Sequence, residues 1–246
     1  MKLYCYYTRA YQILVDEWFF PSAREEYEVI LKQGEKSQSV DYKGSAWNSV
    51  TREKVDFIIE AVRDSWNDTF LFSDPDVQFF KHTKKEILSF IKTHDVVFQR
   101  NSPKRYDLCT GFFVCRGNDS TMQFWNNVRA DMERNNNNDD QDCAINLLVG
   151  HTVRKVHDIL KMRGISVAAG VKLSQCGLNL NRIKWRYFPA RFYCGGTYTG
   201  KRWSLGMDLP IPANIVIHHA NWTVGLEHKI AQLQYVKKIV QARVAR

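Results

Sequence analysis

The chain has 246 residues, of which 44 % are hydrophobic and 25 % are charged, proportions that are typical of a folded globular protein and exclude a disordered one. Its formal net charge of +9 favours an anionic partner, but charge alone does not separate nucleic acid, membrane headgroups and phosphorylated small molecules. No stretch approaches the roughly 18 apolar residues of a membrane-spanning helix, and the amino terminus lacks a secretory hydrophobic segment, so we expect a soluble, cytoplasmic protein without a membrane span.

The amino-terminal segments alternate in type. Residues 3–7 are rich in tyrosine and predict a strand. Residues 21–33 begin with Pro-Ser, followed by a glutamate three positions after the serine; this capping box predicts a helix. Residues 34–44 are polar and predict a loop, with a short strand at 39–42.

A second helix leads into the most informative strand. We expect Thr51 to cap this helix, along which apolar side chains recur at the i, i+3, i+4, i+7 spacing of one buried face. The residues on that face are Val55, Ile58, Ile59, Val62 and Trp66. The apolar run 70–73 then predicts a strand, and it ends at Asp74 and Asp76.

The middle of the chain continues the alternation of helix and strand. A second capping box at residues 83–86 predicts a helix. Residues 95–98 and 111–115 predict strands. We expect Ser120 to cap an amphipathic helix, and residues 143–149 to be helical.

The carboxyl-terminal third has a less regular pattern. Residues 185–196 crowd aromatic and basic side chains together. Residues 214–218 are apolar and predict a strand, and a last helix begins near Gly225. No repeat or linker is visible, so we expect one domain over residues 1–246.

Strands that alternate with helices predict an α/β domain with a mixed, mostly parallel central sheet. In such sheets ligands bind beyond the carboxyl ends of the strands. Thr8 and Arg9 follow the first predicted strand, and Asp74 and Asp76 follow a later one. These residues therefore indicate a ligand site.

The two aspartates are candidate metal ligands. In a strand, residues i and i+2 face the same side, so Asp74 and Asp76 place two like charges together, and a divalent cation would relieve their repulsion. The pair His218 and His219 offers an imidazole, which together with carboxylates suits Mn²⁺. Two alternatives remain open: an Asp-Pro turn that closes the strand, and a histidine pair with a structural role.

The start of the last helix is a candidate phosphate site. Gly225 precedes it and Lys229 lies one turn on. Free N–H groups and the positive end of the helix dipole bind phosphate, and the lysine adds a full charge. The alternative is a solvated lysine on an amphipathic helix.

Asp140, Gln141 and Asp142 form a third constellation at the start of a predicted helix. Acidic residues there complement the helix dipole, so a structural explanation is sufficient. A carboxylate beside an amide also suits binding of sugar hydroxyls or of a reacting carbon, and both interpretations stay open.

Taken in order, these elements resemble the nucleotide-diphospho-sugar transferases of the GT-A fold. The likeness is closest to the GT77-type family and looser to GT8-type enzymes. The residues that carry it are Lys54, Ser73-Asp74-Pro75-Asp76-Val77, Thr110-Gly111-Phe112-Phe113, Asp140-Gln141-Asp142 with Asn146, His219-Ala220-Asn221-Trp222, and Gly225 with Lys229.

The resemblance implies a Rossmann-like α/β/α sandwich that binds a nucleotide sugar through about residues 1–115 and faces the acceptor through about residues 116–246. Without an anchor in the sequence, the chain is similar to the soluble enzymes of bacteria and large algal viruses. For a viral protein, the expected location is the host cytoplasm.

The resemblance also implies roles for individual residues. Asp74, Asp76 and His219 would hold Mn²⁺ or Mg²⁺, with His219 fitting the family position better than His218. The donor, expected to be a UDP-sugar, would contact Thr8, Arg9, Lys54, Asp74, Gly225 and Lys229. The catalytic residues would be Asp140, Gln141 and Asp142.

The implied reaction transfers a sugar from the nucleotide diphosphate to a glycan or glycoprotein acceptor, with retention of the anomeric configuration and without a nucleic-acid partner. Two other classes of protein remain as alternatives. A metal-dependent phosphoesterase uses clustered carboxylates, although usually more than align here. A basic nucleic-acid-binding module would explain the net charge and the run 185–193 through stacking and phosphate contacts, whereas a core or cleft-bordering strand is the structural explanation of that run.

Overall fold

The structure is a computed structural model that describes five ranges of the chain: residues 1–34, 47–102, 107–135, 139–149 and 183–244. The short strand expected at residues 39–42 lies outside these ranges. None of the described helices is both long enough and apolar enough to cross a bilayer.

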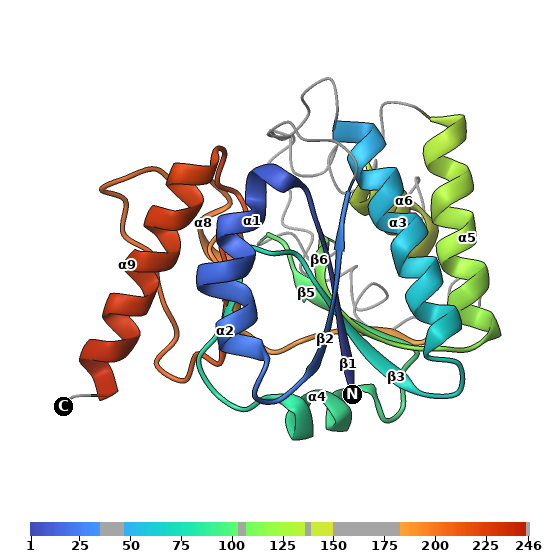
Figure 1. The fold of residues 1–246 in the computed structure, drawn as a ribbon, viewed down its shortest axis with the longest axis horizontal. Coiled ribbons are helices and arrows are strands. Elements are labelled where there is room, and N and C mark those ends of the chain that lie inside the picture. The colour runs from blue at the N-terminus through green and yellow to red at the C-terminus, as the bar shows by residue number, and fades with distance from the viewer. Residues whose placement is uncertain (35–46, 103–106, 136–138, 150–182, 245–246) are drawn as a thin grey trace, which may run out of the picture.

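A six-stranded sheet forms the centre of the molecule (Figure 1), with the strand order β2-β1-β3-β6-β5-β7. Only β6 runs against the others, because it pairs antiparallel with both of its neighbours. The strands are β1 (Lys2–Tyr7), β2 (Glu28–Gln33), β3 (Thr69–Ser73), β5 (Val96–Arg100), β6 (Leu108–Arg116) and β7 (Trp185–Tyr187). The expected α/β class with a mixed, mostly parallel sheet is confirmed.

A second sheet of three strands lies beside the first, in the order β4-β9-β8. Its strands are β4 (Val77–Phe79), β8 (Phe192–Cys194) and β9 (Ile217–His219). Strand β9 pairs antiparallel with β4, and this register sets His219 opposite Val77. A residue near the end of the chain is thereby brought beside the segment that follows β3.

Helices cover both faces of the central sheet. Figure 1 shows α3 (Trp47–Asp64), α5 (Asp119–Arg134) and α6 (Asp140–Val149) on one side, where they enclose an aromatic core. The other side carries α4 (Lys84–Ile91), the small sheet and the helical stretch after β1. That stretch consists of η1 (Arg9–Tyr11), α1 (Gln12–Leu14), η2 (Val15–Phe19) and α2 (Phe20–Ala23), and α8 (Gly196–Thr199) is a further short helix.

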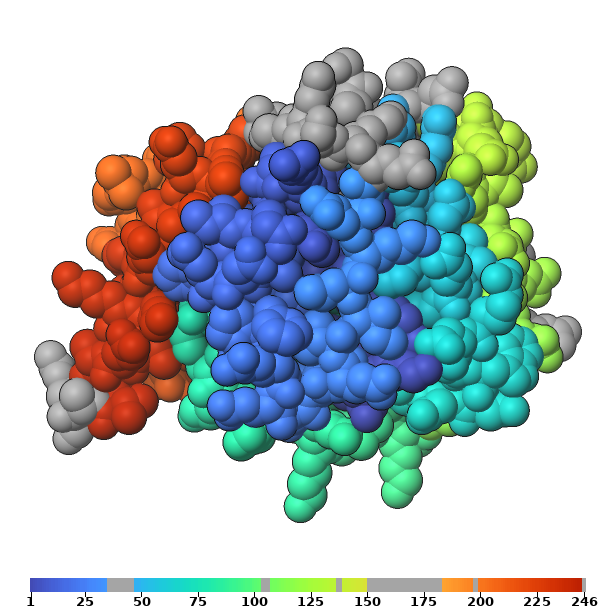
Figure 2. All heavy atoms as spheres, in the orientation of Figure 1, coloured from blue at the N-terminus to red at the C-terminus, as the bar shows by residue number. Residues whose placement is uncertain are grey.

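The last helix, α9 (Leu226–Val244), packs against the stretch that follows β1. Leu233 on α9 belongs to one buried cluster with Leu14, Trp18 and Ala220. Figure 2 shows the two segments adjoining on this face of the molecule. The packing fixes the start of α9 next to the carboxyl end of β1.

The prediction of a helix over residues 21–33 is wrong. The helical stretch ends at Ala23, and Glu28–Gln33 forms β2, which pairs with β1 in parallel along its whole length. The capping signal is local, whereas the pairing with β1 comes from the tertiary fold. Val29 and Ile30 are β-branched and suit an extended edge strand.

Two expected caps lie elsewhere. The chain is already helical at Trp47, and the Thr51 hydroxyl donates to the carbonyl oxygen of that residue at 3.1 Å, as threonines do in helix interiors. Helix α5 is capped by Asn118 rather than by Ser120. The Asn118 side chain accepts from the Thr121 N–H in a reciprocal capping box.

The helix expected after the capping box at 83–86 does form, but its amino terminus is satisfied differently. The carboxylate of Glu26 accepts the N–H groups of Thr83 and Lys84 at 2.7 and 2.8 Å. Glu86 instead pairs with Arg191. A side chain from a distant segment therefore caps α4.

Candidate active site

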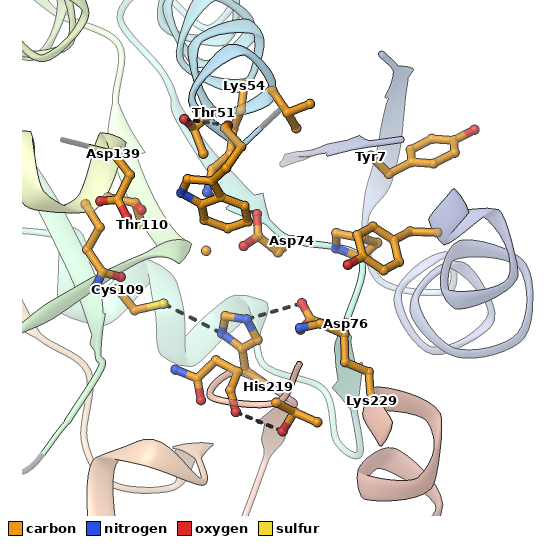
Figure 3. Close-up of a pocket in the computed structure, with 18 of the residues that line it drawn as sticks. Tyr7, Thr51, Lys54, Asp74, Asp76, Cys109, Thr110, Asp139, His219 and Lys229 are labelled. Atoms are coloured by element: carbon orange, nitrogen blue, oxygen red, sulfur yellow. Dashed lines mark hydrogen bonds and ion pairs between the residues drawn. The ribbon is translucent and has the colours of Figure 1, made fainter. Parts of the chain in front are cut away.

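A cavity of about 370 Å³ lies at the carboxyl ends of β1 and β3. Figure 3 shows the side chains around it: Thr51 and Lys54 come from α3, Asp74 follows β3, His219 ends β9, and Lys229 comes from α9. This is the edge of the sheet at which α/β folds bind ligands.

Asp74, Asp76 and His219 come together in this cavity. One ligand atom of each lies within 4.8 Å of the others, and no other group of three or more such residues forms in the described ranges. The His219 Nε2 lies 3.2 Å from the Asp76 Oδ1. Two carboxylates and an imidazole are donors that a divalent cation such as Mn²⁺ accepts.

His219 is oriented by Gln99, a residue that the sequence did not single out. The Gln99 amide nitrogen donates to the carbonyl oxygen of Phe192 at 3.1 Å, so its Oε1 faces the His219 Nδ1 at 2.7 Å. The Nδ1 therefore carries a proton, and the Nε2 is directed toward Asp76. The one signal in the sequence is that a glutamine follows an apolar strand directly.

The neighbouring His218 takes no part in this cluster. Its ring stacks on Tyr193, with 5.8 Å between the centroids. Neither ring nitrogen makes a hydrogen bond within the described residues. Burial lowers the pKa of His218 to about 3, so the ring is neutral. Of the two histidines, His219 is the one that lies where it could share a cation with Asp74 and Asp76.

Gly111 leaves the space in which the cluster forms. A Cβ at this position would lie 2.4 Å from the Asp74 Oδ2 and 2.6 Å from the His219 Cε1. The Gly111 carbonyl also accepts the Asp74 N–H at 2.7 Å. A side chain here would displace two of the three candidate ligands.

Lys229 reaches the same cluster from the second turn of α9. Its Nζ donates to the Asp76 Oδ2 and to the carbonyl oxygen of Ala220, the latter at 3.3 Å. Burial alone would raise the pKa of Asp76, but Lys229 and His219 hold it well below its usual range. Burial opposes a charged His219, yet Asp76 raises the pKa of that ring to about 10.

Lys54 bridges two carboxylates on the opposite wall. Its Nζ lies 3.2 Å from the Asp74 Oδ1 and 2.9 Å from the Asp140 Oδ2. Burial works against its charge, but Asp140 and Asp74 raise the pKa of Lys54 above its ordinary value. Burial likewise raises the pKa of Asp74. The cavity thus holds alternating positive and negative groups.

Gly225 turns the chain into α9 and lines the cavity. Its φ of +88° lies in the left-handed region, which glycine adopts without strain. The N–H groups that follow, at the start of α9, have the positive end of the helix dipole behind them. Together with Lys229, this turn is suited to an anionic group such as a phosphate.

Helix α6 begins at the cavity with Asp140. Asp140 and Gln141 line the cavity, whereas Asp142 does not, because residues two apart on a helix point to different sides. Asp139, which carries no signal of its own in the sequence, accepts the Asp142 N–H at 2.8 Å and caps the helix. Burial and the nearby Asp140 raise the pKa of Asp139 to about 6.

Thr8 and Arg9, the two residues that follow β1, lie in different environments. Thr8 lines the cavity; it is buried, and its hydroxyl has no hydrogen bond within the described part of the chain. Arg9 is exposed and does not line the cavity. Tyr7 and Tyr11 add aromatic surface to the same wall.

The family model of nucleotide-diphospho-sugar transferases matches residues 13–233. The chain belongs to the nucleotide-diphospho-sugar transferase family. It is a glycosyltransferase, and the family implies a nucleotide-sugar donor. No curated protein matches the sequence.

The solved structure of a glycosyltransferase involved in the glycosylation of the major capsid of PBCV-1 is similar to this transferase. The TM-score is 0.53 and the identity 11 %, over 97 % of this chain and 100 % of the other. At that identity the likeness concerns the fold alone, and it confirms a GT-A-type fold. A structure of A197 from STIV reaches a TM-score of only 0.28, at 14 % identity over 51 % of this chain and 68 % of the other, which is too low to bear on the fold.

The aromatic and basic run at 185–193 belongs to the core of this transferase. Trp185 and Phe192 are buried, and the guanidinium groups of Arg186 and Arg191 lie over the ring of Phe90 at 5.5 and 5.8 Å. These rings do not form an exposed platform on which bases could stack. The run therefore gives no support to the nucleic-acid-binding alternative, for which only the net charge of +9 is left.

Proposed function

We propose that this transferase moves a sugar from a UDP-linked donor to a glycan or glycoprotein acceptor, using Mn²⁺ or Mg²⁺ held by Asp74, Asp76 and His219. The observation that supports this most is the convergence of these three side chains in one cavity with Lys229. Kinship with the GT77-type enzymes, beyond the family itself, is part of the proposal.

The residues fit a divalent cation on three counts. Their donor atoms are two carboxylate oxygens and one imidazole nitrogen, within 4.8 Å of one another. Gly111 adds no side chain to the space between Asp74 and His219. Gln99 leaves the Nε2 of His219 directed at that space.

We assign the diphosphate of the donor to Lys229 and the turn at Gly225. In this assignment Lys229 exchanges its contact with Asp76 for one with phosphate. A bound cation would supply further positive charge against the departing diphosphate. Thr8, whose hydroxyl has no hydrogen bond in the described residues, would meet the nucleoside. Arg9 and Asp142 do not line the cavity, and the proposal gives them no contact with the donor.

We assign the sugar to the wall formed by Lys54, Asp140 and Gln141. Breaking the bond at the anomeric carbon leaves positive charge on the sugar ring, which a carboxylate or an amide oxygen stabilises. The ammonium group of Lys54 lies 2.9 Å from the Asp140 Oδ2 and holds this carboxylate at the wall. The proposal includes retention of the anomeric configuration, and it rests on this Asp-Gln-Asp element.

Proton NMR of the reaction tests the proposal. The protein is incubated with Mn²⁺ and a panel of α-linked UDP-sugars, namely UDP-glucose, UDP-galactose and UDP-xylose, with water as the acceptor, and the anomeric signal of the released sugar is followed before it mutarotates. We expect one donor to be consumed and an α-configured product. A β-configured product would reject the role of Gln141, and no consumption of any nucleotide sugar would reject the proposal as a whole.

A pair of variants adds the control. Asp76→Asn is expected to abolish turnover. Asp119→Asn makes the same chemical change at an exposed position outside the cavity and is expected to keep it. Equal loss in both would point to a general effect on folding rather than to the site.

A further inference from the structure

Asn101, at the end of β5, holds two residues of the loop that follows β9. Its Oδ1 accepts from the Asn221 Nδ2 at 2.9 Å and from the Trp222 Nε1 at 3.0 Å. An indole N–H only donates, so the Asn101 side chain must present its oxygen at this place. The orientation of this amide follows from chemistry, because the reverse would set two donors against each other.

The orientation of the second amide follows from the first. Because the Asn101 oxygen faces it, Asn221 must present its nitrogen there, and its own Oδ1 is left over. That oxygen is buried and makes no hydrogen bond within the described residues. A buried amide oxygen without a partner is costly, and the residue lines the active-site cavity.

The wall that carries this oxygen is rigidly built. Trp222 has a φ of +58°, in the left-handed region that bulky residues rarely adopt. Its indole packs on Gly196, where a Cβ would lie 2.4 Å from the Trp222 Cδ1. Its carbonyl accepts the Trp203 N–H at 2.9 Å. Strain of this kind persists where the surrounding structure holds it, and it is common at binding sites.

The unpaired oxygen requires a ligand that donates a hydrogen bond. Phosphate oxygens only accept, so the diphosphate does not meet this requirement. Sugar hydroxyls do. Asn221 lies two residues after His219, and both line the same cavity as Asp140 and Gln141 of α6. In the proposed function, the donor sugar and the acceptor meet in this cavity.

We propose that the Oδ1 of Asn221, held in place by Asn101, accepts a hydrogen bond from a hydroxyl group of a substrate sugar and thereby contributes to sugar selectivity. The proposal rests on the proposed function. The hydroxyl belongs either to the donor sugar or to the acceptor, and the chemistry is the same for both.

Calorimetry tests this proposal. UDP and a UDP-sugar are titrated, in the presence of Mn²⁺, into the wild-type chain and into Asn221→Ala. Asn126→Ala, an exposed position on α5, is the matched control. The affinity for UDP is expected to be the same in all three proteins. If the hydroxyl belongs to the donor, the preference for a UDP-sugar over UDP falls at least about fivefold in Asn221→Ala alone, as expected when one hydrogen bond is lost.

If the hydroxyl belongs to the acceptor, the donor titrations stay unchanged. The loss then appears for methyl glycosides added to the UDP–Mn²⁺ complex and observed by saturation-transfer NMR. The proposal is overturned if Asn221→Ala alters neither response, or if it weakens the binding of UDP itself, which would make Asn221 a contact of the nucleotide or the metal. A wild-type chain that does not bind UDP at all would instead reject the proposed function.

Deoxy analogues of the bound sugar cover the case in which Asn221→Ala unfolds. In the wild-type chain, removal of one particular hydroxyl should weaken binding by a similar factor. In Asn221→Ser, a variant that keeps a polar side chain, the deoxy analogue and its parent sugar should bind equally well. If every deoxy analogue binds like its parent sugar, no hydroxyl meets the Asn221 oxygen and the inference is wrong.

Discussion

The Nε2 of His219 lies 3.2 Å from the Oδ1 of Asp76, although the two residues are far apart in the sequence. The backbone sets this distance. Strand β9 pairs with β4 so that His219 is opposite Val77, and the Ala220 N–H donates to the Asp76 carbonyl oxygen at 2.9 Å. The pairing of β4 with β9 therefore positions two of the candidate metal ligands. We expect the site to form only when the small sheet forms.

The two adjacent histidines provide a matched pair of variants. His219→Ala should lower the affinity for Mn²⁺ by more than about 100-fold, because changes even outside the ligand set cost 10- to 100-fold. His218→Ala removes the neighbouring ring, which stacks on Tyr193, and should leave Mn²⁺ affinity unchanged. Mn²⁺ binding is measured by electron paramagnetic resonance of the free ion. Equal losses in both variants would contradict the assignment.

Gln99 is expected to act through His219. In Gln99→Leu the Nδ1 of the ring loses its acceptor at 2.7 Å and keeps only the Cys109 Sγ at 3.8 Å, so the imidazole is held less firmly and can change its tautomer. We expect Mn²⁺ affinity to fall by about 10- to 100-fold, while Gln99→Glu, which keeps an acceptor oxygen, recovers most of it. A leucine variant that is folded, by circular dichroism, and that binds Mn²⁺ normally would show that the contact does not position the ring.

Gly111→Ala should damage the site and the fold together. The new methyl group would lie 2.4 Å from a carboxylate oxygen of Asp74, so Mn²⁺ binding should be lost. Gly206→Ala is the comparison, because a Cβ there meets nothing but the φ of +89° is strained. It should cost about 1 kcal/mol of stability and leave Mn²⁺ binding intact. Normal Mn²⁺ affinity in Gly111→Ala would contradict the close packing.

The raised pKa of Asp139 predicts that the free energy of unfolding depends on pH. Its pKa is raised from 3.8 to about 6 in the folded chain, so the folded state binds more protons than the unfolded state between these values. Stability from this group is therefore present below pH 4 and is lost as the pH rises to about 6, by up to about 3 kcal/mol.

Asp139→Asn isolates this contribution, because asparagine is an equally good helix cap. The variant should be more stable than the wild-type chain at pH 7 by about 1 to 3 kcal/mol, with the difference disappearing at pH 4. Urea unfolding at the two pH values measures it. The same difference at both pH values would mean that the carboxylate is not destabilised by its surroundings.

The parts of the fold that the sequence predicted are those with a local signal. The apolar strand that ends at Asp74, the helix that starts at Asp140 and the helix after Gly225 are each marked by adjacent residues. The helix expected over residues 21–33 failed because its capping box is local, whereas β2 is decided by its pairing with β1.

The supporting residues of the candidate site carry no such signal. Gln99 and Gly111 matter because of what lies opposite them in space, namely the ring of His219 and the carboxylate of Asp74. Asn101 likewise acts through two residues of a distant loop. The resemblance to a family brought the candidate ligands forward, but the residues that hold them in place became visible only in the structure.

Thermal unfolding with UDP and Mn²⁺ tests the central claim most directly, because a ligand that binds the native state raises the melting temperature. The account predicts that UDP at about 100 times its dissociation constant raises the melting temperature by about 5 to 10 °C when Mn²⁺ is present, and has no effect when the metal is chelated. An equal shift without metal, or none with it, would contradict a cation held by Asp74, Asp76 and His219.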